Sequence, residues 1–212
     1  MYECGAVGGL EWRTIVGAMT ADTDRSQTEL SDFERSHFLR SVRSVRRFAA
    51  TPIADDVLGD VLETARWTGS SKNTQPWELI VVRDGQMLRE LAKCGTFAAH
   101  LAGAQAAVCL VMDDDHQRLD EGRLAQQIMA AAWAHGIGSC IGTLQPDDNI
   151  ARAKELLGVP SERGLRTTIS LGYPADARAL RRSLEPGGAA GVPIGRKPMG
   201  AFVSWERFDQ RG

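Results

Sequence analysis

A polar loop that leads directly into an apolar strand is the feature that most constrains this chain. Residues 68–75 carry hydroxyl, amide and charged side chains and no large apolar residue. After Pro76 the residues become large or β-branched, and this run predicts a buried strand over 79–82. Small hydroxyl and amide groups at such a corner can hydrogen-bond the polar edge of a flat ligand. An ordinary polar connection has the same composition, so the loop alone leaves both interpretations open.

The length and composition are those of a water-soluble protein of one large domain, or at most two small ones, without a nucleic-acid or membrane partner. A chain of 212 residues is long enough to bury about 70% of its unfolded surface. Its 43% hydrophobic and 25% charged residues are ordinary values. A net charge of −2 argues against binding to nucleic acid or to an anionic membrane. We find no apolar run of about 18 residues and no signal peptide, which predicts a cytoplasmic protein.

The cysteines and histidines predict no metal site. None of the four cysteines lies at a metal-ligand spacing such as C-x-x-C; they are Cys4, Cys94, Cys109 and Cys140. We interpret them as reduced thiols that fill apolar space in a cytosolic protein. The four histidines form neither H-x-x-x-H nor H-E-x-x-H; they are His37, His100, His116 and His135.

Hydrophobic periodicity predicts a succession of helices and strands. The expected helices cover residues 30–42, 55–67, 87–94, 97–103, 119–135 and 147–157. The expected strands cover residues 79–82, 106–112, 140–144, 165–171 and 202–205. Residues 106–112 are apolar throughout, which is typical of a central strand. Gly136 follows the longest helix at the place where a left-handed residue would end it.

Residues 1–28 form an irregular extension in this interpretation, and residues 29–212 form the domain. Four glycines interrupt a weak apolar pattern before residue 20. Ser31 is a candidate N-cap of the first helix, because Ser31 and Glu34 have the spacing of a capping box.

A basic motif follows that helix. Arg43 and Arg46 flank Ser44, and two guanidinium groups with a hydroxyl can hold a phosphate monoester. A solvated basic turn that closes a helix is the other interpretation, and the isolated motif favours it.

Two further pairs are candidates for the same ligand. Gly142 and Thr143 can bring backbone amides close to a ring system, although a tight helix–strand turn explains them equally well. Arg196 and Lys197 either complete the phosphate site or form a surface charge run. Residues 113–115 are three aspartates, and we interpret them as a solvated turn because no further ligands stand at cation-binding spacing.

The order of five motifs resembles the FMN-dependent nitroreductase family. They are R-S-V-R-R-F at 43–48, S-S-K-N-T-Q-P-W-E-L-I-V-V at 70–82, H-G-I-G-S at 135–139, L-G-Y-P at 171–174 and R-K-P at 196–198. The resemblance covers residues 36–206. It implies an α+β fold, a three-layer α/β/α sandwich around a mostly antiparallel sheet. It also implies an intertwined homodimer with two FMN sites at the subunit interface.

The resemblance assigns ten residues to the FMN site. The phosphate and ribityl chain would be held by Arg43, Ser44, Arg46, Arg196 and Lys197. The edge of the ring system would be met by Ser70, Ser71 and Asn73, from this subunit or the other, and its reactive face by Gly142 and Thr143. The chain departs from the family pattern at Val42, where an arginine is frequent, and at Gly69, where a proline is common.

The implied activity is a flavin-dependent oxidoreduction. NADH or NADPH would deliver hydride to FMN, and a small electron-poor acceptor such as a nitroaromatic or a quinone would then take the reducing equivalents, in a ping-pong sequence. The resemblance assigns no catalytic acid or base and no metal. Dehalogenation or enone reduction on the same fold is an alternative, as is a non-catalytic flavin-binding protein on the same scaffold. Retention of Arg43, Ser44, Arg46, Asn73 and Arg196 favours the enzyme.

Overall fold

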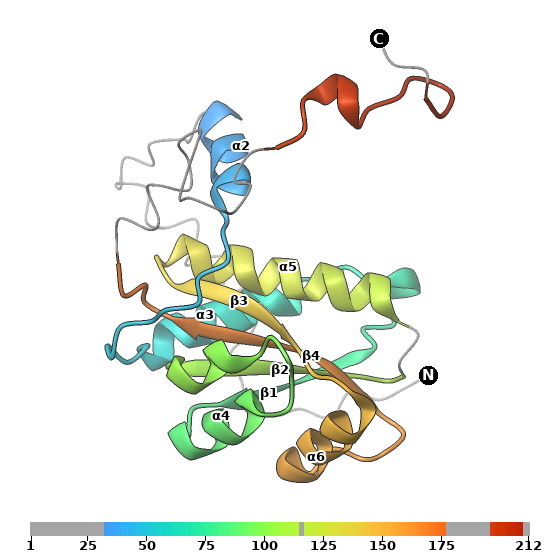
Figure 1. The fold of residues 1–212 in the computed structure, drawn as a ribbon. Coiled ribbons are helices and arrows are strands. Elements are labelled where there is room, and N and C mark those ends of the chain that lie inside the picture. The colour runs from blue at the N-terminus through green and yellow to red at the C-terminus, as the bar shows by residue number, and fades with distance from the viewer. Residues whose placement is uncertain (1–31, 115–116, 177–195, 210–212) are drawn as a thin grey trace, which may run out of the picture. The chain divides into compact units, whose positions relative to one another are not determined.

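The computed structural model describes residues 32–114, 117–176 and 196–209. Compactness divides the chain after Phe38. Of the first unit the structure describes only the beginning of α2, which spans Asp32–Ser41. The second unit carries the sheet and the remaining helices (Figure 1). The expected extension over residues 1–28 and the expected cap at Ser31 lie outside the described residues.

A four-stranded antiparallel sheet forms the centre of this unit. Its strands are β1 (Trp77–Val82), β2 (Ala106–Met112), β3 (Gly138–Thr143) and β4 (Gly164–Gly172), in the spatial order β1-β2-β4-β3. Trp77 pairs with Met112 at one end of the sheet, and Gly138 pairs with Gly172 at the other. Every described residue of β2 is buried, which confirms the prediction of a central strand. The prediction of a mostly antiparallel sheet is confirmed as well.

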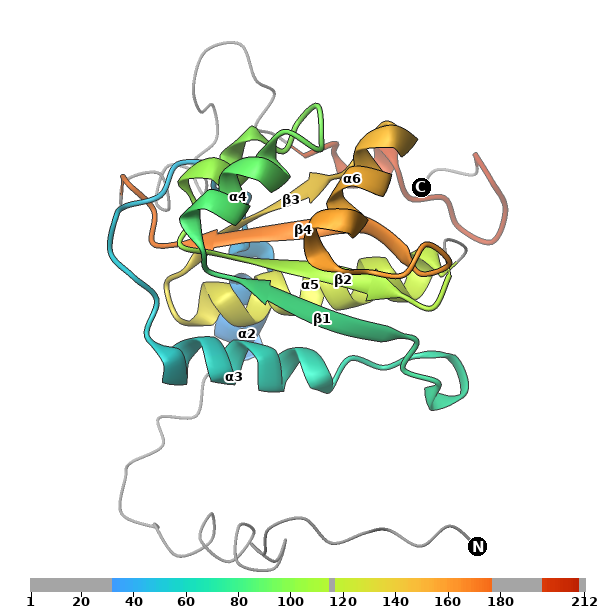
Figure 2. The ribbon, with the colours of Figure 1, turned by 90° about the horizontal axis from the view of Figure 1, so that it is seen from below.

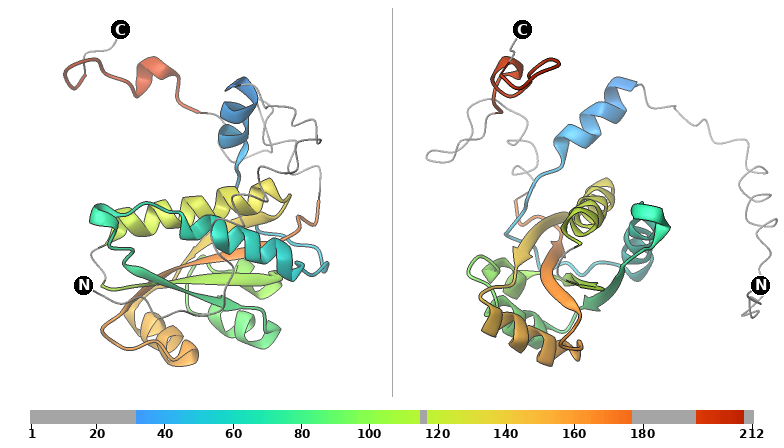
Figure 3. Two further views of the ribbon diagram at one scale, coloured as in Figure 1. Left: turned by 180° about the vertical axis from the view of Figure 1, so that it is seen from behind. Right: turned by 90° about the vertical axis from the view of Figure 1, so that its right-hand side faces the viewer.

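Helices cover both faces of the sheet, which confirms the three-layer α+β prediction. One face carries α3 (Asp55–Arg66) and α5 (Arg118–Ala134). The other carries α4 (Gly85–Ala92), α6 (Asp147–Leu157) and the 3₁₀ helix η2 (Ala99–Gly103), as Figures 1 and 3 show. Each face has a hydrophobic core of its own.

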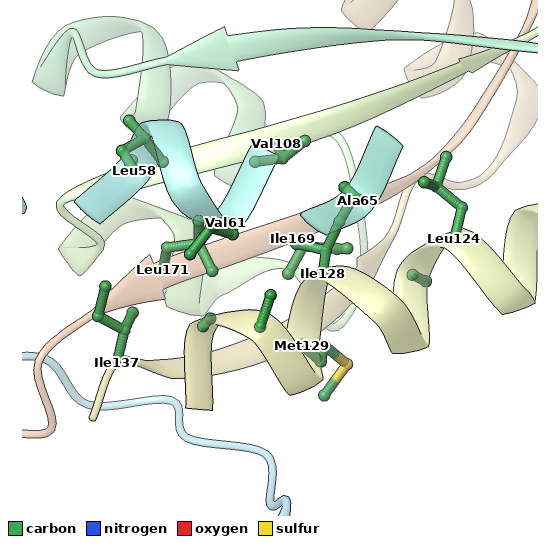
Figure 4. Packing of buried hydrophobic residues seen from close by; sticks show 14 of the residues in the cluster. Leu58, Val61, Ala65, Val108, Leu124, Ile128, Met129, Ile137, Ile169 and Leu171 are labelled. Carbon is green, nitrogen blue, oxygen red and sulfur yellow. The ribbon is translucent and has the colours of Figure 1, made fainter. Parts of the chain in front are cut away.

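The core beneath α3 and α5 is built from regularly spaced apolar residues. Leu58, Val61 and Ala65 line one face of α3, and Leu124 and Ile128 line the facing side of α5 (Figure 4). They pack on side chains of β2 and β4, among them Val108, Ile169 and Leu171. Burial of each large side chain contributes roughly 1.5–3 kcal/mol, so this core is a major source of stability.

Local signals set the helix ends. The side chain of Asp84 accepts a hydrogen bond from the Met87 amide at 2.7 Å and caps α4. Gly136 has φ +69°, and the amide of Ile137 returns to the Ala132 carbonyl at 2.9 Å. The prediction that Gly136 ends the longest helix is therefore confirmed.

The predicted strand over residues 202–205 is wrong. The structure has the 3₁₀ helix η3 (Met199–Ala201) there, followed by bends and turns. The amides of Phe202 and Val203 bond back to the Met199 carbonyl at 3.1 and 2.9 Å. These backbone groups are satisfied locally, and a strand needs a partner that apolar composition alone does not supply.

Arg163 joins the ends of three strands. Its Nε donates to the Met112 carbonyl at 3.0 Å, its Nη1 donates to Glu78 at 2.8 Å, and Asp113 lies 3.3 Å from Nη2. Asp113 thus forms an ion pair within the expected aspartate turn. Among the described residues, no group of three His, Cys, Asp or Glu could hold a metal ion.

Arg163→Ala is expected to lower the free energy of unfolding by about 1–2 kcal/mol, because it leaves a strand-end carbonyl and Glu78 without their donor. Urea unfolding with an unchanged m value measures this. Arg152→Ala is the matched control: it removes one exposed pair with Glu90 and should change stability by less than about 1 kcal/mol. Equal losses in both variants would contradict the prediction.

Candidate functional site

A basic pocket lies where the segment after α2 meets the edge of the sheet. It has a volume of about 620 Å³. Its described lining consists of Arg43, Ser44, Val45, Arg46, Arg47, Pro174, Ala175 and Asp176. Three guanidinium groups against one carboxylate make this a site for an anion.

The backbone of residues 42–49 is held against two strands. The Val45 amide donates to the Ser139 carbonyl of β3 at 2.8 Å, and Ser44 forms a parallel bridge with Ser139. Farther along, the Ala49 amide donates to the Tyr173 carbonyl at 2.7 Å, just beyond β4. This segment therefore presents Ser44 and Arg46 from a fixed backbone at the sheet edge.

Two glycines allow this close approach. A Cβ atom at Gly138 would lie 2.6 Å from the Cβ of Val45, and one at Gly172 would lie 2.9 Å from that of Phe48. Side chains at these two positions would therefore push the segment away from the sheet.

Arg43 fits both interpretations that the sequence left open. Its Nη1 donates to the carbonyl oxygens of Arg40 and Val42, at the end of α2, as expected of a cation that closes a helix. The same residue lines the basic pocket. Its contact with the helix end thus orients a guanidinium group that belongs to the pocket wall.

Arg46 acts electrostatically on the sheet beside it. Burial raises the pKa of the Cys140 thiol, while Arg46 and a hydrogen bond from Ser44 act in the opposite direction. Burial and Arg46 together lower the pKa of His100. Ser44 and Arg46 therefore lie next to the buried side of β3.

The edge of β3 offers backbone groups close to the pocket. The Ser139 carbonyl faces outward toward Val45, and main-chain groups of alternate residues in a strand face the same side. The backbone groups of Ile141 and Thr143 therefore face the same edge. Gly142 is buried, whereas Ile141 is 43% exposed. Thr143 therefore lies farther along this edge, about 13 Å from Ser139 at the usual rise per residue, whereas the Gly142 carbonyl is directed to Thr168 of β4.

The loop that contains Ser70, Ser71 and Asn73 is a tight turn. Ser71–Asn73 form the 3₁₀ turn η1, and Ser70 Oγ accepts a hydrogen bond from the Gln75 amide at 2.8 Å. Lys72, Asn73 and Gln75 have positive φ angles of 51°, 55° and 49°. Such angles are uncommon outside glycine and often occur at binding sites. Ser71 and Asn73 are exposed, so the turn displays them to an external ligand.

Within a single chain, this loop lies far from the basic pocket. The loop precedes Trp77 on the outer strand β1, whereas residues 42–49 lie beside the outer strand β3 and the opposite end of the sheet. Figure 2 shows residues 42–54 at one end of α3 and residues 67–76 at the other. The twelve residues of α3 alone span about 17 Å.

Arg196 and Lys197 belong to the described segment 196–209, which follows the undescribed residues 177–195. The described lining of the basic pocket includes no residue of that segment. Their role at the site stays a prediction.

Sequence reasoning missed residues that support the site from behind. Val45 and Gly138 are neighbours in the fold, but the sequence shows Gly138 only as part of the H-G-I-G-S motif that ends the longest helix. His100, a single polar residue in an otherwise apolar 3₁₀ helix, was not singled out. Such an isolated polar residue on an apolar element is the signal that would have found it.

The described cysteines are buried, as expected of apolar fillers. Burial raises the pKa of Cys109 to about 12 and raises those of Cys94 and Cys140. In a Cys4→Ser variant, the three remaining thiols are expected to react slowly with Ellman's reagent at pH 8 and rapidly after unfolding in guanidinium, because the thiolate is the reacting form. Rapid reaction of a native thiol would contradict this burial.

Comparison with known proteins finds relatives that are named as NAD(P)H or flavin oxidoreductases. A protein of Archaeoglobus fulgidus, provisionally named NADH dehydrogenase/NAD(P)H nitroreductase, is 32% identical over 144 residues, covering 64% of this chain and 83% of that protein. The NADPH-flavin oxidoreductase of Vibrio harveyi is 30% identical over 154 residues, covering 62% of each. The structure of an FMN-dependent nitroreductase from Clostridium difficile R20291 superposes with a TM-score of 0.60 at 29% identity, covering 66% of this chain and 87% of that chain.

The family comparison covers most of the second unit. The model of the nitroreductase family matches residues 39–173, which include the basic pocket segment, the loop over 70–73 and the edge of β3. The sequence resemblance is thereby confirmed, and the chain belongs to the nitroreductase family.

Proposed function

We propose that this protein is an FMN-dependent oxidoreductase that passes reducing equivalents from NADH or NADPH to electron-poor acceptors, such as nitroaromatics or quinones, in a ping-pong sequence. The observation that carries the proposal is the pocket of about 620 Å³ walled by Arg43, Ser44, Arg46 and Arg47. Two of the similar proteins are named for FMN or flavin dependence.

The residues of the pocket fit the phosphate end of FMN. Arginine presents a planar fork of donors that matches phosphate oxygens, and Ser44 adds a hydroxyl. Arg43 and Arg46 would share the charge of the phosphate, and Arg47 lies within the same wall. Arg47 would thereby supply a guanidinium group where Val42 departs from the family pattern. Arg196 and Lys197 would join this end from the C-terminal segment.

The edge of β3 fits the ring end. The backbone of Thr143 would donate toward the ring, and the exposed side chain of Ile141 would pack on it. Gly142 would let the strand lie close to Thr168 and His100 behind it. When bound, FMN supplies the hydride-accepting and hydride-donating chemistry. The chain would hold it, orient it, and place polar groups where negative charge develops.

The loop over 70–73 would complete the site from a second subunit. It lies at the far end of the sheet within its own chain, yet it exposes Ser71 and Asn73 on a turn with three left-handed residues. A homodimer that places the loop of one subunit beside the pocket of the other satisfies both observations. Each of two sites would then combine residues of both chains.

Subunit complementation tests this arrangement. The variant Arg43→Ala/Arg46→Ala and the variant Ser71→Ala/Asn73→Ala should each be nearly inactive. After they are mixed, unfolded and refolded together, a heterodimer would contain one site with both defects and one site with neither. Partial recovery of activity is therefore expected. Activity that stays at the level of the separate variants would place the whole site in one chain.

The activity itself has a direct test. The purified protein, supplied with FMN, should be yellow and should oxidise NADH or NADPH when menadione or nitrofurazone is present. A screen of both donors against both acceptors would identify the preferred pair. A colourless protein that takes up no added FMN would refute the proposal. A protein that binds FMN but transfers no electrons would favour a flavin-binding protein without this activity.

No helix in the described part of the chain has the length and apolar character needed to cross a membrane.

A further inference from the structure

His100 is a buried side chain that is not among the residues assigned to FMN above. It lies in η2 and is 8% exposed. Its Nδ1 is 2.8 Å from Ser170 Oγ, and that hydroxyl donates to the Cys140 carbonyl at 3.2 Å. Because the hydroxyl has a single proton, Nδ1 must be the donor to Ser170. This chain of hydrogen bonds fixes the ring orientation and its tautomer.

The ring and a neighbouring hydroxyl support β3 from behind. A Cβ atom at Gly142 would lie 3.4 Å from His100 Cε1 and 2.9 Å from Thr168 Oγ1. Thr168 Oγ1 also donates to the Gly142 carbonyl at 3.1 Å. The strand is therefore held at Cys140 and Gly142, on either side of Ile141, next to the edge that would face the flavin ring.

The surroundings of His100 favour a neutral ring. Burial is the main cause that lowers its pKa, Arg46 lowers it further, and the Ile141 backbone acts weakly in the other direction. The charged group that acts on it is Arg46, from the pocket segment, which also acts on the buried Cys140 of β3. Its Nε2 is buried without a hydrogen-bond partner among the described residues. A protonated ring would repel the Arg46 guanidinium, whereas a neutral ring tolerates it.

We propose that His100 is a positioning residue of the FMN site. The neutral imidazole, held by Ser170, fixes the position of the Ile141–Thr143 backbone relative to the flavin ring and permits Arg46 to remain beside the pocket. One buried side chain thereby links the phosphate end and the ring end of the site. This inference rests on the proposed function, because the two ends are assigned to FMN.

Flavin binding separates a positioning role from a purely structural one. His100→Ala is expected to raise the FMN dissociation constant of the apoprotein about tenfold, the effect of one to two lost neutral hydrogen bonds. His100→Asn should recover most of that loss, since its amide can donate to Ser170. Cys109→Ala is the control: Cys109 is fully buried on the same sheet face opposite Thr168, and its loss should lower Tm without changing FMN affinity.

The outcomes distinguish this inference from the proposed function. Parental FMN affinity in His100→Ala, or the same loss of affinity in Cys109→Ala, would overturn the positioning role. If the parent itself bound no FMN, the proposed function would fail first.

The link to Arg46 is tested without FMN. The pKa of His100, followed by NMR in the apoprotein, should rise in Arg46→Ala and stay unchanged in Arg47→Ala, because Arg46 adds to the effect of burial in lowering this pKa and Arg47 does not act on it. A His100 pKa that is insensitive to Arg46→Ala would overturn the link.

Discussion

Arg43→Ala/Arg46→Ala is expected to raise the FMN dissociation constant by a factor of roughly 10² to 10⁴. Each charge-assisted hydrogen bond to a phosphate contributes roughly 1.5–3 kcal/mol, and tenfold in affinity corresponds to about 1.4 kcal/mol. Both residues line the same pocket. Fluorescence titration of the apoprotein with FMN measures the change, and titration with riboflavin, which lacks the phosphate, should show a much smaller one.

The control for this variant removes the same charge elsewhere. Arg89→Ala/Arg152→Ala deletes two cations from α4 and α6, outside the described lining of the pocket. It should leave FMN affinity within about twofold of the parent, since both residues are exposed and salt screens the interactions of exposed charges. Equal losses in the two double variants would show that net charge, and not the pocket, attracts the cofactor.

Gly138→Ala is expected to lower both stability and flavin binding. The added Cβ would lie 2.6 Å from the Cβ of Val45, and 2.8 and 2.9 Å from its two methyl groups. Val45 cannot yield easily, because its amide is bonded to Ser139. We expect a loss of about 1–3 kcal/mol in the free energy of unfolding. Displacement of Ser44 and Arg46 should weaken FMN binding at least about tenfold, as in the loss of one charge-assisted bond.

Two further variants make this prediction specific. Val45→Gly in the Gly138→Ala background removes the clashing side chain and should restore part of the flavin affinity. Gly59→Ala adds a Cβ atom that would have no neighbour within 4 Å outside its own helix backbone, and it should stabilise the protein by up to about 1 kcal/mol. If Gly138→Ala behaved like Gly59→Ala in urea unfolding and FMN titration, the packing of residues 42–49 on β3 would not hold in solution.

Local pattern was sufficient for most of the fold. The strand over 106–112 and the helix over 147–157 were predicted with their observed bounds, because apolar runs and helical periodicity are properties of neighbouring residues. The strand predicted from residue 140 begins at Gly138. Glycine has low strand propensity, and pairing with Gly172 sets that boundary from a distance.

The site was predictable where its residues are neighbours in sequence. Arg43, Ser44 and Arg46 line one pocket, as a single motif suggested. The distance between that motif and the loop at Asn73 depends on the strand order β1-β2-β4-β3, which no local pattern contains. The support from His100 likewise depends on which strands lie beneath η2.

The placement of the basic pocket outside both hydrophobic cores has a consequence for how the protein would be assembled. Ser44, Arg46 and Arg47 are exposed, and the two cores draw their buried members from other residues. The folded scaffold therefore does not depend on FMN for its interior. Dialysis against concentrated salt should yield a folded, colourless apoprotein with near-native circular dichroism, and added FMN should reload it without a refolding step.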